Sequence, residues 1–240
     1  MRIAMWSGPR NLSTAMMYSF ANRGDCHVVD EPFYGPYLRL TGLPHPMADE
    51  IKASRPEDAG EVARDLLGPI PGGKPHAYHK HMCQHMIEGI PRDFMADCVN
   101  VFLIRHPARV VASFTKGYAH AGAEDIGFET QAELHDHVRS LGQAPVVIDS
   151  ADIRRDPDGM LRALCGAIGL PFDEGMLSWP AGGHPQDGAW APHWYASVHR
   201  STGFASAEGR LPALSGDAAR LADEAMPHYE KLRARALSAH

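Results

Sequence analysis

The stretch WSGPRNLST, residues 6–14, decides the fold expected for this chain. It begins where a short apolar run, residues 2–6 (RIAMW), predicts a buried strand that stops at the Ser-Gly-Pro turn. After the turn, residues 12–22 are rich in Ala, Met, Tyr and Phe and end shortly before Gly24, which predicts a helix. The pattern is therefore a strand, a sharp turn and a helix.

This pattern is typical of a site for an anion. A strand that turns sharply into a helix directs free backbone N–H groups toward one point, and the helix dipole favours negative charge there. Arg10 adds a planar cationic donor, and the Ser13 and Thr14 hydroxyls add two more donors. The stretch is not a Walker A loop, because no Gly-Lys precedes Thr14. The simpler alternative is a helix capped by Ser13 or Thr14, with Arg10 on the surface.

Further apolar segments alternate with helices along the chain. Strands are predicted at residues 26–29, 76–81, 99–104 and 145–149, and helices at residues 59–67, 107–116, 130–141, 157–168 and 216–237. Buried strands separated by helices indicate an α/β fold of three layers, α/β/α, around a mostly parallel central sheet. We expect one domain over residues 1–240, in which the Pro- and Gly-rich residues 34–75 form an insertion or lid.

The composition excludes several classes of protein. The formal net charge of −6 gives no global attraction to nucleic acid. No apolar run reaches the roughly 18 residues that span a bilayer, and no signal peptide is evident, so neither a membrane partner nor export is expected and a cytoplasmic location is predicted. The four cysteines form no CxxC pair, which favours free buried thiols.

A second motif, RHPARVVASF at residues 105–114, follows the most strand-like segment of the chain. Pro107 suits the first turn of a helix, so Arg105 falls at the end of the strand and Ser113 about two turns further on. Ligands of open α/β sheets bind at this edge, where a guanidinium and a hydroxyl suit a second phosphate. Alternatively, Arg105 is a surface charge and Ser113 a small packing residue.

Together these segments resemble sulfotransferases that use 3′-phosphoadenosine 5′-phosphosulfate (PAPS). Residues 8–14 look like their 5′-phosphosulfate loop, and residues 105–113 are similar to their 3′-phosphate motif in the spacing of Arg and Ser. Residues 146–172 resemble bacterial members in the VVID strand, the Asp-Pro pair and the helix that ends in IGLPF. The resemblance implies a P-loop-like fold and PAPS as the sulfuryl donor.

The resemblance also implies roles for single residues. Arg10 takes the position of the basic residue that contacts the 5′-phosphosulfate, and Arg105 and Ser113 take those that hold the 3′-phosphate. The implied donor-binding set is Gly8, Pro9, Arg10, Asn11, Leu12, Ser13, Thr14, Arg105 and Ser113. Leu12 departs from the family pattern, which often has Gly there. The Arg-Lys-Gly segment of animal members is not evident, and residues 200–203 (RSTG) are a candidate replacement.

An acceptor hydroxyl or amine needs a base, and histidine titrates near neutral pH. The segment HKHMCQH, residues 79–85, lies between the two motifs. We predict His81 as the base and Lys80 as a second sulfonate contact beside the catalytic Arg10, although strand alternation puts His81 and Lys80 on opposite faces. The other candidate bases are His79, His85 and Glu31. The three histidines also form a possible zinc set, but no water-activating partner accompanies them and no metal is expected.

The sequence therefore predicts a sulfotransferase that moves a sulfuryl group from PAPS to a hydroxyl or amine of a small molecule. The alternatives are a non-catalytic nucleotide-phosphate-binding protein and a phosphotransferase on the same fold, although the missing Lys-Ser/Thr pair argues against the latter. Variable loops at residues 34–75, 117–130 and 178–205 are expected to select the acceptor. The oligomeric state stays open, with a homodimer among the alternatives.

Overall fold

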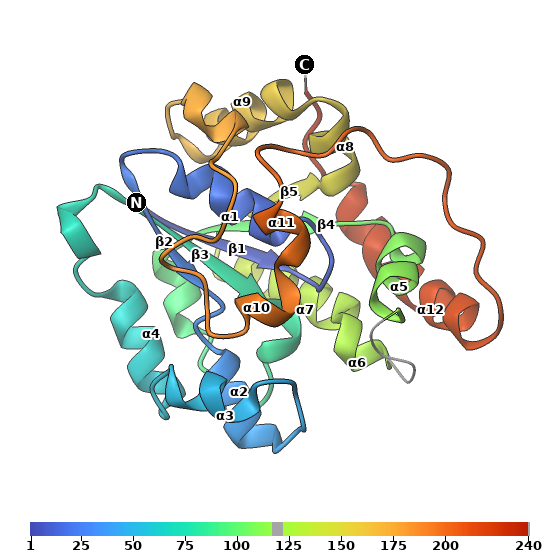
Figure 1. The fold of residues 1–240 in the computed structure, drawn as a ribbon, viewed down its shortest axis with the longest axis horizontal. Coiled ribbons are helices and arrows are strands. Elements are labelled where there is room, and N and C mark those ends of the chain that lie inside the picture. Colours follow the sequence, from blue (N-terminus) through green and yellow to red (C-terminus); the bar gives the residue numbers. More distant parts are fainter. Residues whose placement is uncertain (117–121, 240) are drawn as a thin grey trace.

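A parallel sheet forms the middle of the molecule in the computed structural model, which describes residues 1–116 and 122–239 (Figure 1). Its strands are β1 (Arg2–Ser7), β2 (Cys26–Asp30), β3 (His76–Met82), β4 (Val99–Ile104) and β5 (Val146–Asp149). The strand order is β2-β3-β1-β4-β5, and each neighbouring pair is parallel. The predicted α/β fold with a mostly parallel sheet is confirmed.

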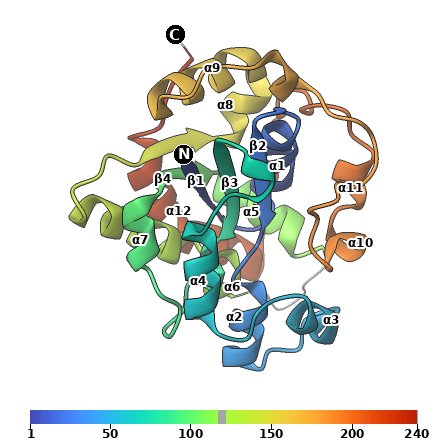
Figure 2. The ribbon, with the colours of Figure 1, turned by 90° about the vertical axis from the view of Figure 1, so that its left-hand side faces the viewer.

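Helices connect the strands. They are α1 (Ser13–Ala21), α2 (Tyr34–Thr41), α3 (Ala48–Ala53), α4 (Ala59–Leu67), α5 (Pro107–Phe114), α6 (Ala123–Ile126), α7 (Phe128–Ser140), α8 (Ser150–Arg155), α9 (Pro157–Ile168), α10 (Ala191–Trp194), α11 (Ala196–His199) and α12 (Gly216–Arg233). Residues 117–121 of the variable loop predicted at residues 117–130 lie outside the described residues. Longer helices pack on both faces of the sheet (Figures 1 and 2).

Alternation along β1 explains these two layers. Ala4 and Trp6 point to one face, where α4, α7 and α12 bury apolar residues against them. Ile3 and Met5 point to the other face, which α1 and α9 cover. Both faces are therefore buried, which is why β1 and β4 are apolar along most of their length.

Residues 34–75 contain more helix than the sequence predicted. The sequence predicted only α4 there, because Gly35 and Pro36 are typical of turns. The structure adds α2 and α3. Pro36 lies in the first turn of α2, where no backbone N–H is needed, and α2 buries Tyr34 and Leu38 in a cluster that includes Trp190. Packing against a distant part of the chain thus stabilises a helix that local sequence disfavours.

The strand order reverses at the carboxyl ends of β1 and β4, and we call this edge of the sheet the crevice. The chain leaves β1 toward β2 and β3 and then crosses to β4 on the other side, so the strand order reverses between β1 and β4. Ligands of open α/β sheets bind at such a point. The Gln131 side chain of α7 bridges the two strand ends, since Nε2 donates to the carbonyls of Trp6 and Leu103 at 3.0 Å each.

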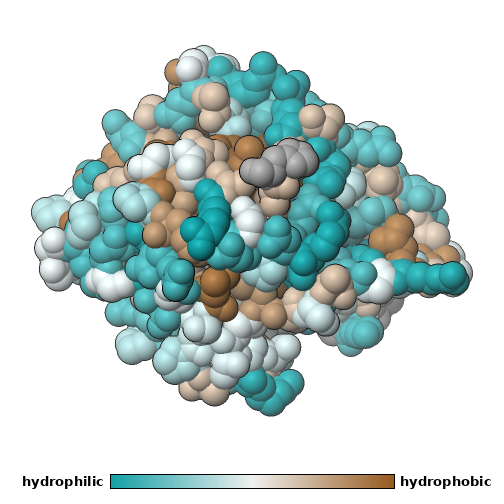
Figure 3. All heavy atoms as spheres, turned by 90° about the horizontal axis from the view of Figure 1, so that it is seen from above, coloured by the Kyte–Doolittle hydropathy of each residue, from teal (hydrophilic) through white to brown (hydrophobic). Residues whose placement is uncertain are grey.

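In the described part of the chain, no helix is both long and apolar enough to cross a bilayer. The face above α8 and α9 mixes hydrophilic and apolar residues (Figure 3). All four cysteines are buried and free, which confirms the prediction of unpaired thiols.

Candidate active site

Residues 8–14, hereafter the phosphate loop, run from the end of β1 into α1. Arg10 and Leu12 both adopt the left-handed backbone region, with φ of 62° and 73°. Leu12 is the N-cap of α1, and no side chain caps the helix. The alternative in which Ser13 or Thr14 caps α1 is therefore wrong. The N–H groups at this end are left without a side-chain cap, which suits an anion.

Leu12 forms the turn even though the family pattern often has glycine there. A left-handed conformation costs a residue with a Cβ about 1–2 kcal/mol. The Leu12 side chain packs against the core between the sheet and helices α1 and α9, which offsets part of this cost. The departure from glycine thus leaves the sharp turn in place.

Gly8 lies where the phosphate loop touches α6. A Cβ on Gly8 would lie 2.7 Å from the backbone oxygen of Ile126, a distance at which the chain must shift. We expect Gly8→Ala to lower the free energy of unfolding by about 1–3 kcal/mol, as overpacking does elsewhere. Denaturant unfolding measures this loss. Gly24→Ala is the matched control, because nothing lies within 4 Å of its Cβ; equal losses in both variants would contradict the close contact.

The two arginine motifs meet at the crevice. Arg10 Nε donates to Ser113 Oγ at 2.9 Å, and Arg105 Nη1 donates to the Arg10 carbonyl at 2.5 Å. Burial and the nearby charge of Arg105 lower the pKa of Arg10. The phosphate loop and residues 105–113 are thus brought together because β1 and β4 are neighbours in the sheet.

Arg105 is one of three guanidinium groups around a single carboxylate. We call Arg105, Arg109 and Arg154 the arginine cluster. Glu208 Oε1 accepts from Arg105 Nε at 3.0 Å and from Arg154 Nη1 at 2.8 Å, and Glu208 Oε2 lies 2.8 Å from Arg109 Nε. Local sequence patterns did not single out Arg109, Arg154 or Glu208 as members of a site. Arg154 lies in the helix after β5, as Arg105 lies directly after β4, and this placement was the available signal.

His81 lies in the aromatic core. Its ring is 1% exposed, stacks on Trp6 at 4.2 Å and faces Phe33 at 5.8 Å. Neither ring nitrogen has a hydrogen-bond partner, and burial lowers the pKa of His81 well below its usual value. A neutral ring enclosed in this way does not reach an acceptor. The structure therefore does not place the predicted base where it is needed.

The other two histidines of this segment are also enclosed. His85 stacks between Tyr34 and Tyr37, and burial lowers its pKa. Burial lowers the pKa of His79 to about 3. Within residues 1–116 and 122–239, no three His, Cys, Asp or Glu side chains are grouped so as to hold a metal ion, which counts against the zinc alternative.

Lys80 lies on the opposite face of β3 in a buried ionic network. Its Nζ lies 2.9 Å from Asp30 Oδ1, 2.5 Å from Glu31 Oε1 and 2.6 Å from the Tyr195 hydroxyl. Asp30 and Lys80 are paired neighbours in the β2–β3 register. Burial alone would lower the pKa of Lys80, but the Asp30 and Glu31 charges outweigh it and raise this pKa. Burial raises the pKa of Asp30, although Lys80 opposes the shift.

Glu31 is the most exposed carboxylate of this network, with 7% of its surface open against 1% for Asp30. Its φ of 38° is unusual for a residue with a Cβ, and the following Pro32 restricts it further. Strained backbone of this kind occurs at functional sites. Glu31 is therefore a residue with an unfavourable backbone conformation whose carboxylate is held by Lys80.

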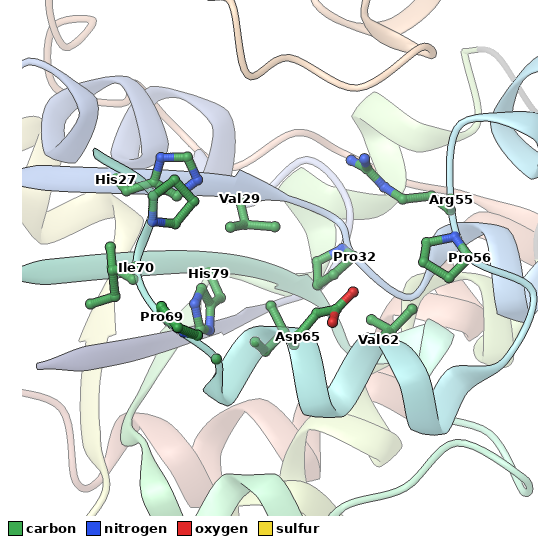
Figure 4. A pocket seen from close by; sticks show the side chains of 14 residues that line it. His27, Val29, Pro32, Arg55, Pro56, Val62, Asp65, Pro69, Ile70 and His79 are labelled. Atoms are coloured by element: carbon green, nitrogen blue, oxygen red, sulfur yellow. The ribbon is translucent and has the colours of Figure 1, made fainter. Parts of the chain in front are cut away.

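A pocket of about 210 Å³ lies between α4 and strands β2 and β3 (Figure 4). His27, Val29 and His79 line it from the strands, and Val62 and Asp65 line it from α4. No residue of the phosphate loop or the arginine cluster lines it. This pocket is thus separate from the crevice at the end of β1.

Comparisons with known proteins agree with this arrangement. The family model described as a sulfotransferase domain matches residues 1–236. The branched-chain-amino-acid aminotransferase-like proteins 2 and 1 of Arabidopsis thaliana are 36% and 37% identical to the chain over 234 and 231 residues. Each alignment covers 96% of this chain and 41% of the relative, so the chain spans about two fifths of the length of these curated relatives.

Two solved structures share the fold. The sulfotransferase domain of the Synechococcus PCC 7002 olefin synthase has a TM-score of 0.51 at 19% identity, with 93% of this chain and 94% of that one covered. The sulfotransferase domain from the curacin biosynthetic pathway has a TM-score of 0.54 at 15% identity, with 92% and 96% covered. At these identities the likeness shows the three-layer fold and no more.

Proposed function

This chain belongs to the sulfotransferase-domain family, and on that premise we propose that it transfers a sulfuryl group from PAPS to a hydroxyl or amine of a small molecule. The observation that carries the proposal is the contact between the two motifs. Arg10 of the phosphate loop binds Ser113 at 2.9 Å beside Arg105, at the reversal of strand order. Two groups of anion-binding residues at one crevice suit a nucleotide with phosphates on both the 3′ and 5′ oxygens.

In this proposal the phosphate loop binds the 5′-phosphosulfate. The uncapped first turn of α1 supplies N–H donors, and the Ser13 and Thr14 hydroxyls add to them. Arg105 and Ser113 bind the 3′-phosphate. The remaining loop residues Gly8, Pro9, Asn11 and Leu12 shape the turn; Asn11 Nδ2, for example, donates to the Leu103 carbonyl at 3.2 Å.

The reaction is an in-line displacement at sulfur. The acceptor oxygen or nitrogen forms a bond to sulfur while the bond from sulfur to the 5′-phosphate oxygen breaks, and its electron pair stays on that oxygen. Arg10 stabilises the charge that develops there. No metal is required, because the sulfuryl group carries less charge than a terminal phosphoryl group. The products are the sulfated acceptor and 3′,5′-adenosine bisphosphate.

We assign the role of the general base, which accepts the proton of the acceptor group, to Glu31 instead of His81. Glu31 lies at the carboxyl end of β2, and Lys80 holds its carboxylate. The Lys80 ammonium already contacts oxygens of Asp30, Glu31 and Tyr195, so we give it a positioning role in place of a sulfonate contact. His81 is left as part of the aromatic core.

Calorimetry without magnesium tests the donor. We expect 3′,5′-adenosine bisphosphate to bind at least about tenfold more tightly than AMP, because a hydrogen bond to a charged group contributes about 1.5–3 kcal/mol. ATP should bind weakly. Arg105→Gln should remove most of the preference for the bisphosphate, whereas the exposed Arg162→Gln of α9 should not. Equal affinity of the unchanged protein for AMP and the bisphosphate would contradict the proposal.

A further inference from the structure

The arginine cluster has three positive charges, but only one negatively charged side chain of the described residues pairs with it. Its three guanidinium groups come from the end of β4, from α5 and from α8. In the described residues, Glu208 is the one carboxylate in an ion pair with any of them. The cluster therefore keeps two uncompensated charges, in a chain whose formal net charge is −6.

The Glu208 carboxylate lies among the three guanidinium groups of the arginine cluster. Its side chain is 4% exposed, and each of the three arginines contacts one of its two oxygens. A phosphate monoester has three terminal oxygens and nearly two negative charges at neutral pH, so it would match three guanidinium groups better than a carboxylate does.

Arginine side chains hold the middle of the segment that carries Glu208, and apolar contacts of Phe204 and Leu214 hold its two ends. Residues 204–214, the strap, link α11 to α12 around the outside of the molecule (orange to red in Figure 1). In the described structure the strap makes no backbone–backbone hydrogen bond. Arg154 Nε donates to the Ser206 carbonyl at 2.9 Å, and Arg109 donates to the Gly209 carbonyl. No ladder or helix has to break for Glu208 to move.

We propose that Arg105, Arg109 and Arg154 form one subsite for the 3′-phosphate of the donor, and that Glu208 occupies this subsite in the ligand-free protein as an internal competitor. The inference rests on the proposed function. It adds Arg109 and Arg154 to the donor site, and it makes Glu208 a group that the 3′-phosphate must displace. A nucleotide without a 3′-phosphate leaves Glu208 in place.

Calorimetry with two nucleotides that differ only in the 3′-phosphate tests this inference. We expect Arg154→Gln to weaken binding of 3′,5′-adenosine bisphosphate by about tenfold or more, because the lost contact is a charge-assisted hydrogen bond. The affinity for AMP should stay within about twofold of that of the unchanged protein. Glu208→Gln should tighten the bisphosphate severalfold and leave AMP unchanged. Arg155→Gln is the matched control: Arg155 follows Arg154 on α8 but pairs with Asp152, so the affinity for neither nucleotide should change.

Several outcomes overturn the inference. One is that Arg154→Gln lowers the affinity for both nucleotides equally, or lowers neither. Another is weaker binding of the bisphosphate in Glu208→Gln, which would mean that Glu208 orients the arginines for binding and does not compete with the ligand. Thermal unfolding checks that each variant is folded, and Glu208→Ala provides a second variant. If the unchanged protein binds neither nucleotide, the proposed function itself fails, and that result differs from the others.

Discussion

Turnover should fall by about 10²–10³-fold when Arg10 is replaced by Gln, which corresponds to about 2.7–4 kcal/mol of transition-state stabilisation. Arg10 is the cation of the phosphate loop, and its side chain lies against Ser113 at the mouth of the crevice. The charge it balances develops on the leaving oxygen as the sulfur–oxygen bond breaks. The effect should therefore appear mainly in kcat.

Steady-state assays with labelled PAPS measure this loss, and calorimetry with 3′,5′-adenosine bisphosphate shows whether the site is still formed. Arg162→Gln is the control, because Arg162 is an exposed arginine that pairs with Asp158 on its own helix. If kcat changes by less than about tenfold in Arg10→Gln, charge stabilisation by Arg10 is not the main catalytic effect.

The second large effect is expected from Glu31→Gln, which should lower kcat by about 10²–10⁴-fold, the contribution of a general base. Gln keeps an oxygen for Lys80 but does not accept a proton. Binding of 3′,5′-adenosine bisphosphate should change little, because Glu31 is not part of the phosphate loop. The loss should thus separate chemistry from donor affinity.

His81→Phe is the matched control for this prediction. Phe retains the stacking against Trp6 and Phe33 but has no nitrogen to titrate. If His81→Phe loses turnover while Glu31→Gln keeps it, the base is His81 and the enclosed ring must become accessible during turnover. Thermal unfolding of both variants shows whether a loss reflects chemistry or an altered core.

The sequence predicted the sheet and the sharp turn of residues 8–14 between strand and helix, because both depend on local patterns. Apolar runs ended by turn residues placed all five strands, and Ala59–Leu67 agrees with α4. Helix α2 was missed, because its Gly35 and Pro36 favour a turn and contacts with distant residues such as His85 and Trp190 stabilise it. Such long-range packing leaves no local signal.

The site was harder to predict for the same reason. Alternation along β3 separates His81 from Lys80 as predicted, but it does not tell which face meets the crevice. The face with His81 is covered by the aromatic core, and the face with Lys80 meets Tyr195, 115 residues further along the chain. Glu208 lies 103 residues beyond Arg105, so no local sequence pattern indicates that the two residues pair.

The left-handed residues of the phosphate loop have one more consequence, for the kinetics of donor binding. Arg10 and Leu12 adopt this unfavourable left-handed conformation in the folded protein itself, and packing of Leu12 against the core offsets its energetic cost. The donor therefore spends little of its binding energy on arranging the loop, which is the advantage of preorganisation. Association at this end should be a single encounter without a slow loop rearrangement, so the observed binding rate should rise linearly with the concentration of AMP, which leaves Glu208 in place.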